Sequence, residues 1–198
     1  RPWMPAAGNH ENELGNGPIG YGAYQTYFEV PDSGASPPLR GLWYSFTAGA
    51  VRVISINNDD VALQDAGNSY IHGYSGGEQR RWLEGELADA RRDPGIDWLI
   101  ICMHHTAIST AEKNGADLGI REQWLPLFDQ YHVDLVLCGH EHHYERSHPL
   151  RGSLGSDTRT PIPVDTRRDV IDTTRGTVHL VIGGGGTSVP TNGLLFPE

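Results

Sequence analysis

Cysteine and long apolar runs are both scarce in this chain. It contains only two cysteines, Cys102 and Cys138, without the CxxC spacing of a thiolate zinc site. Each lies within an apolar run, so we expect two buried thiols in neighbouring strands, with a disulfide between them as the alternative. No run of about 18 apolar residues is present, which argues against a membrane-spanning helix and against a membrane partner.

Positive charge is also in short supply. The 198 residues include 15 Lys and Arg against 25 Asp and Glu, giving a net charge of -10. This balance argues against a nucleic-acid partner that is held by a basic face. The negative net charge does not argue against a phosphate ester as substrate, because a bound metal cation makes the local electrostatic potential positive. The length fits one domain over residues 1–198 with a sizeable core.

Several familiar catalytic motifs are missing. His140-Glu141 lacks the closing histidine of a zincin helix, because His142-His143-Tyr144 follows. The glycines at 183–186 lead into Thr187-Ser188 rather than the lysine of a phosphate loop, which favours a glycine-rich turn beside a site.

Apolar patterning predicts an alternation of strands and helices. Residues 42–46 and 51–56 resemble a hairpin. Ser75 and Glu78 match a capping box at the start of a helix that Pro94-Gly95 ends. Further elements are expected as follows: a strand remnant at 4–7, a strand at 97–103 buried on both faces, a helix at 120–131, a strand at 133–138, a loop at 151–174 and a strand at 177–182. This order predicts an α/β sheet with parallel neighbours and right-handed crossovers.

Histidines cluster at three places where apolar runs end. His140 and His142 follow one such run, and residues at i and i+2 of an extended segment share a face. Imidazole is a common metal ligand, and sites of α/β sheets lie at strand ends. A lone histidine is more often a satisfied core or surface residue, but three such ends favour one convergent metal site.

The other two places supply Asn9-His10 and His104-His105. Gly8-Asn9-His10 alone is compatible with a simple tight turn. The carbonyl oxygen of Asn9 is a suitable metal ligand, and His10 would then point towards a substrate. Adjacent residues of a strand face opposite ways, so only one of His104 and His105 is expected to be a ligand, and the other a supporting or surface residue.

These motifs together resemble a known family. Gly8-Asn9-His10-Glu11, the run ending at His104, and Gly139-His140-Glu141-His142 resemble the last three of five metal-binding blocks of the calcineurin-like metallophosphoesterases. Within that superfamily, His142-His143-Tyr144-Glu145-Arg146 and the 176–181 segment before the glycines resemble the purple acid phosphatases. The similarity covers nearly the whole chain.

The resemblance implies a four-layer αββα sandwich and a dinuclear centre containing iron together with zinc, manganese or iron. It implies that Asn9, His104 and His140 bind the divalent metal and that His142 binds the ferric ion. His10 would hydrogen-bond the phosphate and assist the leaving group. A further substrate residue is expected at Lys113 or His105. The implied reaction is hydrolysis of small phosphate monoesters, and the implied location is secreted, periplasmic or at the cell surface.

One departure from the family pattern leaves alternatives open. The D-x-G and G-D-x-x-Y blocks, with two aspartates and a tyrosine among the metal ligands, should precede Gly8-Asn9-His10 and are absent. We therefore expect a longer natural protein, with the N-terminal strands missing here. The alternatives to a phosphomonoesterase are a phosphodiesterase or nucleotidase with the same site, and a catalytically silent metal-binding fragment. The oligomeric state is not predicted.

Overall fold

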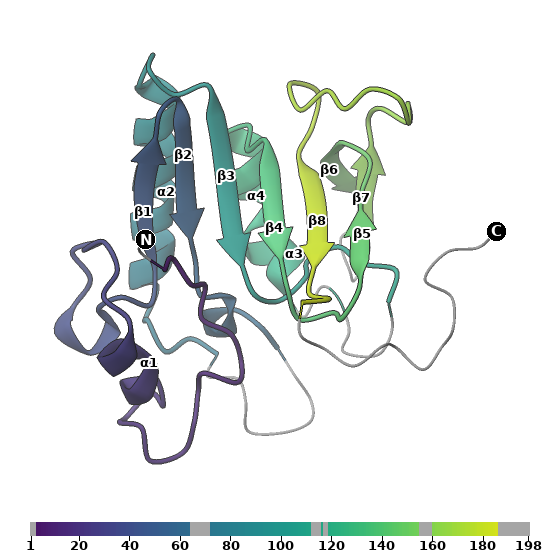
Figure 1. The fold of residues 1–198 in the computed structure, drawn as a ribbon. Coiled ribbons are helices and arrows are strands. Elements are labelled where there is room, and N and C mark those ends of the chain that lie inside the picture. Colours follow the sequence, from purple (N-terminus) through teal and green to yellow (C-terminus); the bar gives the residue numbers. More distant parts are fainter. Residues whose placement is uncertain (1–2, 64–71, 112–115, 117–118, 155–159, 186–198) are drawn as a thin grey trace.

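The computed structural model describes residues 3–63, 72–111, 116, 119–154 and 160–185. Within them, one six-stranded sheet has the order β1-β2-β3-β4-β8-β5, and β6 and β7 form a separate pair (Figure 1). The strands are β1 (Tyr44–Ala48), β2 (Val51–Ser55), β3 (Trp98–Met103), β4 (Leu135–Cys138), β5 (Tyr144–Arg146), β6 (Leu150–Leu154), β7 (Thr160–Pro163) and β8 (Val178–Ile182).

The sheet combines an antiparallel hairpin with a parallel centre. The predicted hairpin is confirmed, since β1 and β2 pair antiparallel across Gly49, whose positive φ suits the tight turn. Strands β2, β3, β4 and β8 are parallel neighbours, and β5 returns antiparallel along β8. The carboxyl ends of four strands therefore meet at one edge of the sheet, where sites of α/β proteins are built.

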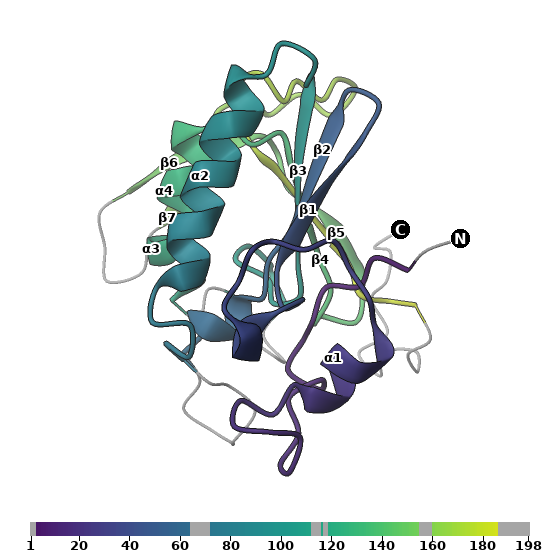
Figure 2. The same ribbon diagram turned by 90° about the vertical axis from the view of Figure 1, so that its left-hand side faces the viewer.

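Helices cover one face of this sheet. The α-helices are α1 (Gly22–Tyr27), α2 (Glu78–Arg92), α3 (Ile120–Gln123) and α4 (Leu125–Gln130), and the 3-10 helices are η1 (Pro37–Leu39) and η2 (Asn58–Asp60). Figure 2 shows α2, α3 and α4 on the same side of the sheet. The mixed α/β class is as expected. The resemblance implies four layers, and the described residues contain two of them, the six-stranded sheet and the layer of α2, α3 and α4. None of their helices is long and apolar enough to cross a membrane.

The main core lies between the sheet and these helices. Leu83 and Leu87 of α2 are four residues apart, which places them on one face, and both are fully buried. Trp124 and Phe128 pack in the same core, between the short helices α3 and α4 and the sheet. The prediction that strand 97–103 is buried on both faces is wrong, because Trp98 is 47% exposed and Ile100 and Cys102, on the same face, are only partly buried.

The two cysteines lie in neighbouring strands, as predicted, and both are free thiols, but only Cys138 is buried and Cys102 is partly exposed. Cys138 pairs with Met103 rather than with Cys102, so the side chains of the two cysteines point to opposite faces of the sheet. This arrangement rejects the alternative of a disulfide. Burial raises the pKa of the Cys102 thiol to about 11 and that of Cys138 to about 12, which keeps both thiols protonated.

Two helix predictions need correction. The capping box at Ser75 and Glu78 does not form: Gly77 is the N-cap of α2, and the Glu78 carboxylate accepts hydrogen bonds from the backbone and hydroxyl of Ser36 instead. The predicted helix 120–131 is two short helices. Pro126 has no amide proton for the helical hydrogen-bond pattern, so the helix is interrupted at Trp124.

Three loop and strand predictions also change. Residues 4–7 form no strand; the backbone oxygen of Pro5 instead accepts hydrogen bonds from the hydroxyls of Tyr24 and Tyr44. The predicted loop 151–174 contains most of β6 and all of β7. Strand β5, which the sequence did not predict, pairs with β8 through only three residues, too few to show an alternating pattern.

Acidification should weaken the fold through His179 of β8. This side chain is 3% exposed, and burial, assisted by the charge of Arg121, lowers its pKa to about 3. The folded state thus favours the neutral ring, and stability present above pH 6.5 is lost as the pH falls towards 3. We expect a contribution of about 2 kcal/mol to disappear between pH 7 and 4.5.

Urea unfolding of the wild-type chain and of His179→Gln at both pH values measures this contribution. The variant should lose less stability on acidification than the wild type does. Equal losses in the two proteins would contradict the assignment to His179, because His104 and His105 remain in both and their pKa values are lowered in the same direction.

Candidate metal centre

The first component is a turn that follows the buried Ala7. The backbone amide of Gly8 donates to the Glu11 carboxylate at 2.7 Å, and the amide of Glu11 donates to the Gly8 oxygen at 3.1 Å. These two bonds close the turn around Asn9. A side chain at Gly8 would collide with the imidazole of His104, since an added Cβ would lie 2.5 Å from its Cγ. Glycine is therefore required for this close approach.

The second component is the end of β3. His104 follows Met103 directly, beyond the last pair of the β3–β4 ladder. Its backbone oxygen accepts from the amide of Gly139 at 3.0 Å, which ties the exits of β3 and β4 together. The side chain of His104 thus projects from the carboxyl edge of the sheet towards the Gly8 turn.

The third component is the turn after β4. His140 has a φ of 62°, a left-handed conformation that is uncommon for residues other than glycine. The bond from the Glu141 amide to the Gly139 oxygen, at 2.7 Å, helps to hold this turn. Such backbone strain persists only where the surroundings enforce it, and it is frequent at functional sites.

Polar atoms from these three components converge. His104 Nε2 lies 2.9 Å from Asn9 Oδ1 and 3.2 Å from His140 Nδ1. Ligand atoms around a metal with bonds of about 2.1 Å lie about 3.0–3.4 Å apart, so this spacing suits a shared ion. One amide oxygen and two imidazole nitrogens also suit zinc, manganese or iron.

Electrostatics favour the metal-binding form of His104. Burial, with the positive charge of His140, His10 and His142, lowers the pKa of His104 to about 4. The ring is therefore neutral at neutral pH and keeps a lone pair for a cation. The donor set and its protonation state both fit a divalent metal.

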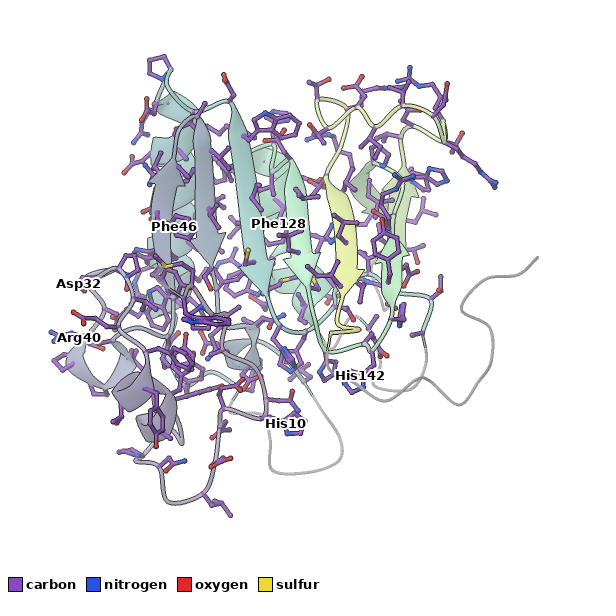
Figure 3. All side chains as sticks on the ribbon, in the orientation of Figure 1. His10, Asp32, Arg40, Phe46, Phe128 and His142 are labelled. Carbon is purple, nitrogen blue, oxygen red and sulfur yellow. The ribbon has the colours of Figure 1, made fainter. Side chains whose placement is uncertain are left out.

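The remaining predicted residues lie at various distances from this centre. His10 and His142 are exposed beyond the carboxyl ends of the strands, and both act electrostatically on His104 (Figure 3). Their assignments to substrate and to a second metal stay predictions. Lys113 lies outside the described residues.

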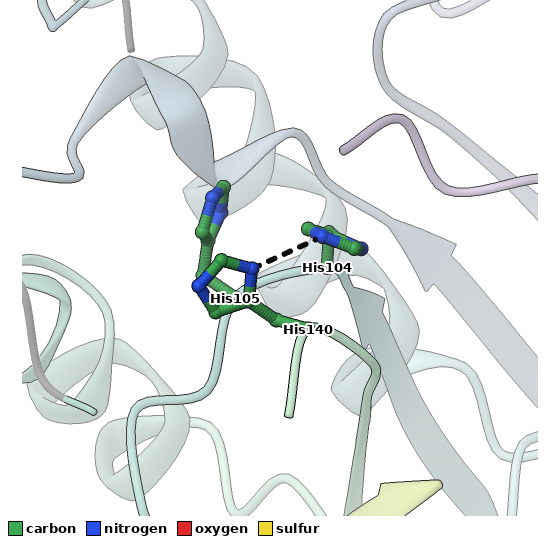
Figure 4. Close-up of side chains that lie close together, drawn as sticks. All are labelled: His104, His105 and His140. Atoms are coloured by element: carbon green, nitrogen blue, oxygen red, sulfur yellow. Dashed lines mark hydrogen bonds between the residues drawn. The ribbon is translucent and has the colours of Figure 1, made fainter. Parts of the chain in front are cut away.

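His105 occupies a different position from His104. Its side chain is fully buried, and its ring packs with those of His104 and His140, with a ring nitrogen of each within 4.8 Å of the others (Figure 4). Complete burial favours the supporting role over contact with a substrate. Burial first, and then the charge of His140 and His104, lowers the pKa of His105 well below its usual value.

Three residues behind His105 were not recognised in the sequence. Asn58 Oδ1 lies 2.9 Å from His105 Nδ1, and Asp59 Oδ1 lies 3.2 Å from His105 Nε2. The other Asp59 oxygen accepts a short hydrogen bond from Tyr21. Burial raises the pKa of Asp59 to about 7, although the bond from Tyr21 opposes the shift. The available signal was the strongly polar 57–60 run directly after an apolar strand.

The turn after β8 also supports the centre. A Cβ added at Gly183 would lie 2.2 Å from the backbone oxygen of Glu141 and 3.2 Å from the carbonyl carbon of Gly139. Gly183→Ala should therefore displace the turn that carries His140. We expect about 2 kcal/mol of lost stability and weaker zinc binding, measured by thermal unfolding with and without zinc.

Gly184→Ala is the matched control, because a Cβ at that neighbouring glycine meets no atom within 4 Å. It should leave both quantities nearly unchanged. If Gly183→Ala behaves like Gly184→Ala, the close contact between the two turns is not required for the centre.

The fold is an α/β fold with a candidate metal site at the carboxyl edge of its sheet, and comparison with known proteins identifies the family. The calcineurin-like phosphoesterase family model matches residues 1–144, so the chain belongs to that family. The chain is 81% identical over its whole length to an uncharacterized protein of Mycobacterium tuberculosis. It is 32% identical over 154 residues, 74% of the chain, to a purple acid phosphatase of Glycine max.

A solved structure shows the same relationship. The purple acid phosphatase PPD1 from yellow lupin seeds aligns with 93% of this chain at 25% identity and a TM-score of 0.59. The mixed α/β fold therefore matches that of a purple acid phosphatase, as the sequence predicted. The chain spans 38% of the length of the mycobacterial relative, 30% of the Glycine max protein and 31% of the lupin chain.

Proposed function

We propose that this chain carries part of the catalytic centre of a dinuclear metallophosphatase that hydrolyses phosphate monoesters. The observation that supports the proposal is the convergence of Asn9 Oδ1, His104 Nε2 and His140 Nδ1 at the carboxyl edge of the sheet. The family, whose members use metal ions, and the purple acid phosphatases among the relatives support the same reaction class.

In this proposal, Asn9, His104 and His140 hold a divalent ion, and His142 is a ligand of a second, ferric ion. Two metal ions bound there would activate a water nucleophile and stabilise the charge that develops in phosphoryl transfer. The divalent ion would be zinc, manganese or iron. Apart from His142, the resemblance places the ligands of the second ion in blocks that this sequence does not contain.

The proposed role of His10 is to bind the phosphate and to stabilise the leaving oxygen. Its neighbour Asn9 is held by the Gly8–Glu11 bonds, so the same turn would orient a metal ligand and a substrate ligand. His10 is exposed, as a side chain must be if it contacts a soluble substrate directly. We propose a small phosphate ester as that substrate.

Phosphate release by the 198-residue chain, with zinc, manganese or iron added, tests the proposal. Comparison of p-nitrophenyl phosphate with bis(p-nitrophenyl) phosphate separates monoesters from diesters, and His104→Ala is the negative control. We expect weak, metal-dependent hydrolysis of the monoester, because this sequence supplies the three proposed ligands of the divalent ion but only His142 for the second ion. His104→Ala should remove this activity. Preference for the diester would instead assign a phosphodiesterase, and metal binding without hydrolysis of either ester would identify a silent metal-binding module.

A further inference from the structure

A buried polar group lies directly behind the proposed metal ligands. It consists of Asn58 and Asp59 in η2, Tyr21 before α1, and His105 after β3. All four side chains are fully buried, although three of them lie in segments that contribute none of the proposed ligands. Burying such polar groups is costly unless they bond to one another, so their arrangement calls for an explanation.

Asn58 fixes the orientation of His105. Its Nδ2 donates to the backbone oxygen of His105 at 2.9 Å, and its Oδ1 accepts from the backbone amide at 3.1 Å. The same oxygen lies 2.9 Å from His105 Nδ1. Because a carbonyl oxygen only accepts, this contact places a proton on Nδ1.

Asp59 faces the other side of the same ring. Its Oδ1 lies 3.2 Å from His105 Nε2, while its second oxygen accepts from the Tyr21 hydroxyl. Both ring nitrogens of His105 therefore face Asn58 and Asp59. This arrangement distinguishes His105 from His104 and His140, whose nitrogens face each other at 3.2 Å.

The fixed ring of His105 contacts both proposed ligands. Its centroid lies 5.0 Å from that of His104 in an edge-on arrangement at 86°, and 4.6 Å from that of His140 at 54°. His140 is the ligand with the left-handed backbone, so its ring orientation depends on such neighbours.

We propose that His105, held by Asn58 and flanked by Asp59, is a positioning residue that fixes the rings of His104 and His140 for metal binding. The inference rests on the proposed metal centre and adds a supporting shell to it. Residues that orient metal ligands in this way contribute strongly to affinity, and their replacement typically weakens metal binding by about 10- to 100-fold.

Zinc affinity of the 198-residue chain, measured by competition with a chromophoric chelator, tests the proposal. His105→Ala opens space behind both ligands, and Asp59→Asn keeps the shape while removing the carboxylate. We expect each variant to bind zinc about 10- to 100-fold more weakly than the wild type. Circular dichroism selects samples that retain the fold, so that unfolding is not counted as lost affinity.

Asp134→Asn is the matched control. Asp134 is also a buried carboxylate, but it accepts from Arg91, the Leu99 amide and Thr173 near the amino ends of β3 and β4. This variant should lose stability and keep its zinc affinity. If Asp59→Asn behaves in the same way, Asp59 is merely structural and the proposal is overturned.

X-ray absorption at the zinc edge tests whether His105 is itself a ligand. The proposal expects two imidazoles around zinc in the wild type, and a third from His105 would overturn it. Equal zinc affinity in the wild type and both variants would also overturn it while leaving the proposed phosphatase centre intact. Absence of zinc binding by the wild type would overturn both.

Discussion

His104→Ala should lower the zinc affinity of this chain by more than about 100-fold, which exceeds the effect expected for supporting residues. His104 Nε2 is the atom that lies within 3.2 Å of both other proposed ligand atoms, so its removal leaves Asn9 and His140 without their shared neighbour. Isothermal titration with zinc at pH 7 measures the loss. At that pH the ring of His104 is neutral, because its pKa is lowered to about 4.

His132→Asn is the control for a general effect of losing a histidine. His132 precedes β4 and so lies at the opposite end of the parallel strands from His104. Its φ is 51°, and asparagine tolerates this left-handed conformation better than alanine does. The control should bind zinc as the wild type does. Unchanged affinity in His104→Ala would exclude the proposed centre.

Trp124→Ala should destabilise the chain by about 3–5 kcal/mol, the range typical of large aromatic residues removed from a core. Trp124 is fully buried at the junction of α3 and α4, within the cluster that packs these helices on the sheet. Its loss leaves a cavity that the short helices cannot fill without moving. Urea unfolding at pH 7 measures the change.

Trp98→Ala provides the comparison for this prediction. Trp98 lies on the opposite face of the sheet and is 47% exposed, so it buries less apolar surface. Its replacement should cost clearly less than that of Trp124. Similar losses at the two positions would mean that the helix-covered face is not the principal core.

Much of the sheet could be predicted because its strands have simple patterns. The apolar runs before His104 and His140 became β3 and β4, and the hairpin became β1 and β2. Their ends then had to meet, since parallel neighbours share one carboxyl edge. The proximity of His104 and His140 follows from this rule, whereas Asn9 reaches His104 because glycine at position 8 permits the close approach.

The rest depended on tertiary contacts that leave weak signals in a sequence. Glu78 accepts a hydrogen bond from Ser36 instead of capping its own helix, and β5 is a strand through its pairing with β8. The setting of His105 is the clearest case. Strand alternation indicated that the side chains of His104 and His105 point in different directions. Asn58 and Asp59 precede His105 by 47 and 46 positions, so only the folded chain brings them to the ring of His105.

A crystal structure of the zinc-soaked chain, with anomalous data collected at the zinc edge, tests the central claim most directly. The account predicts an anomalous peak in contact with Asn9 Oδ1, His104 Nε2 and His140 Nδ1. A zinc ion bound elsewhere, with these three side chains still bonded only to one another, would contradict it.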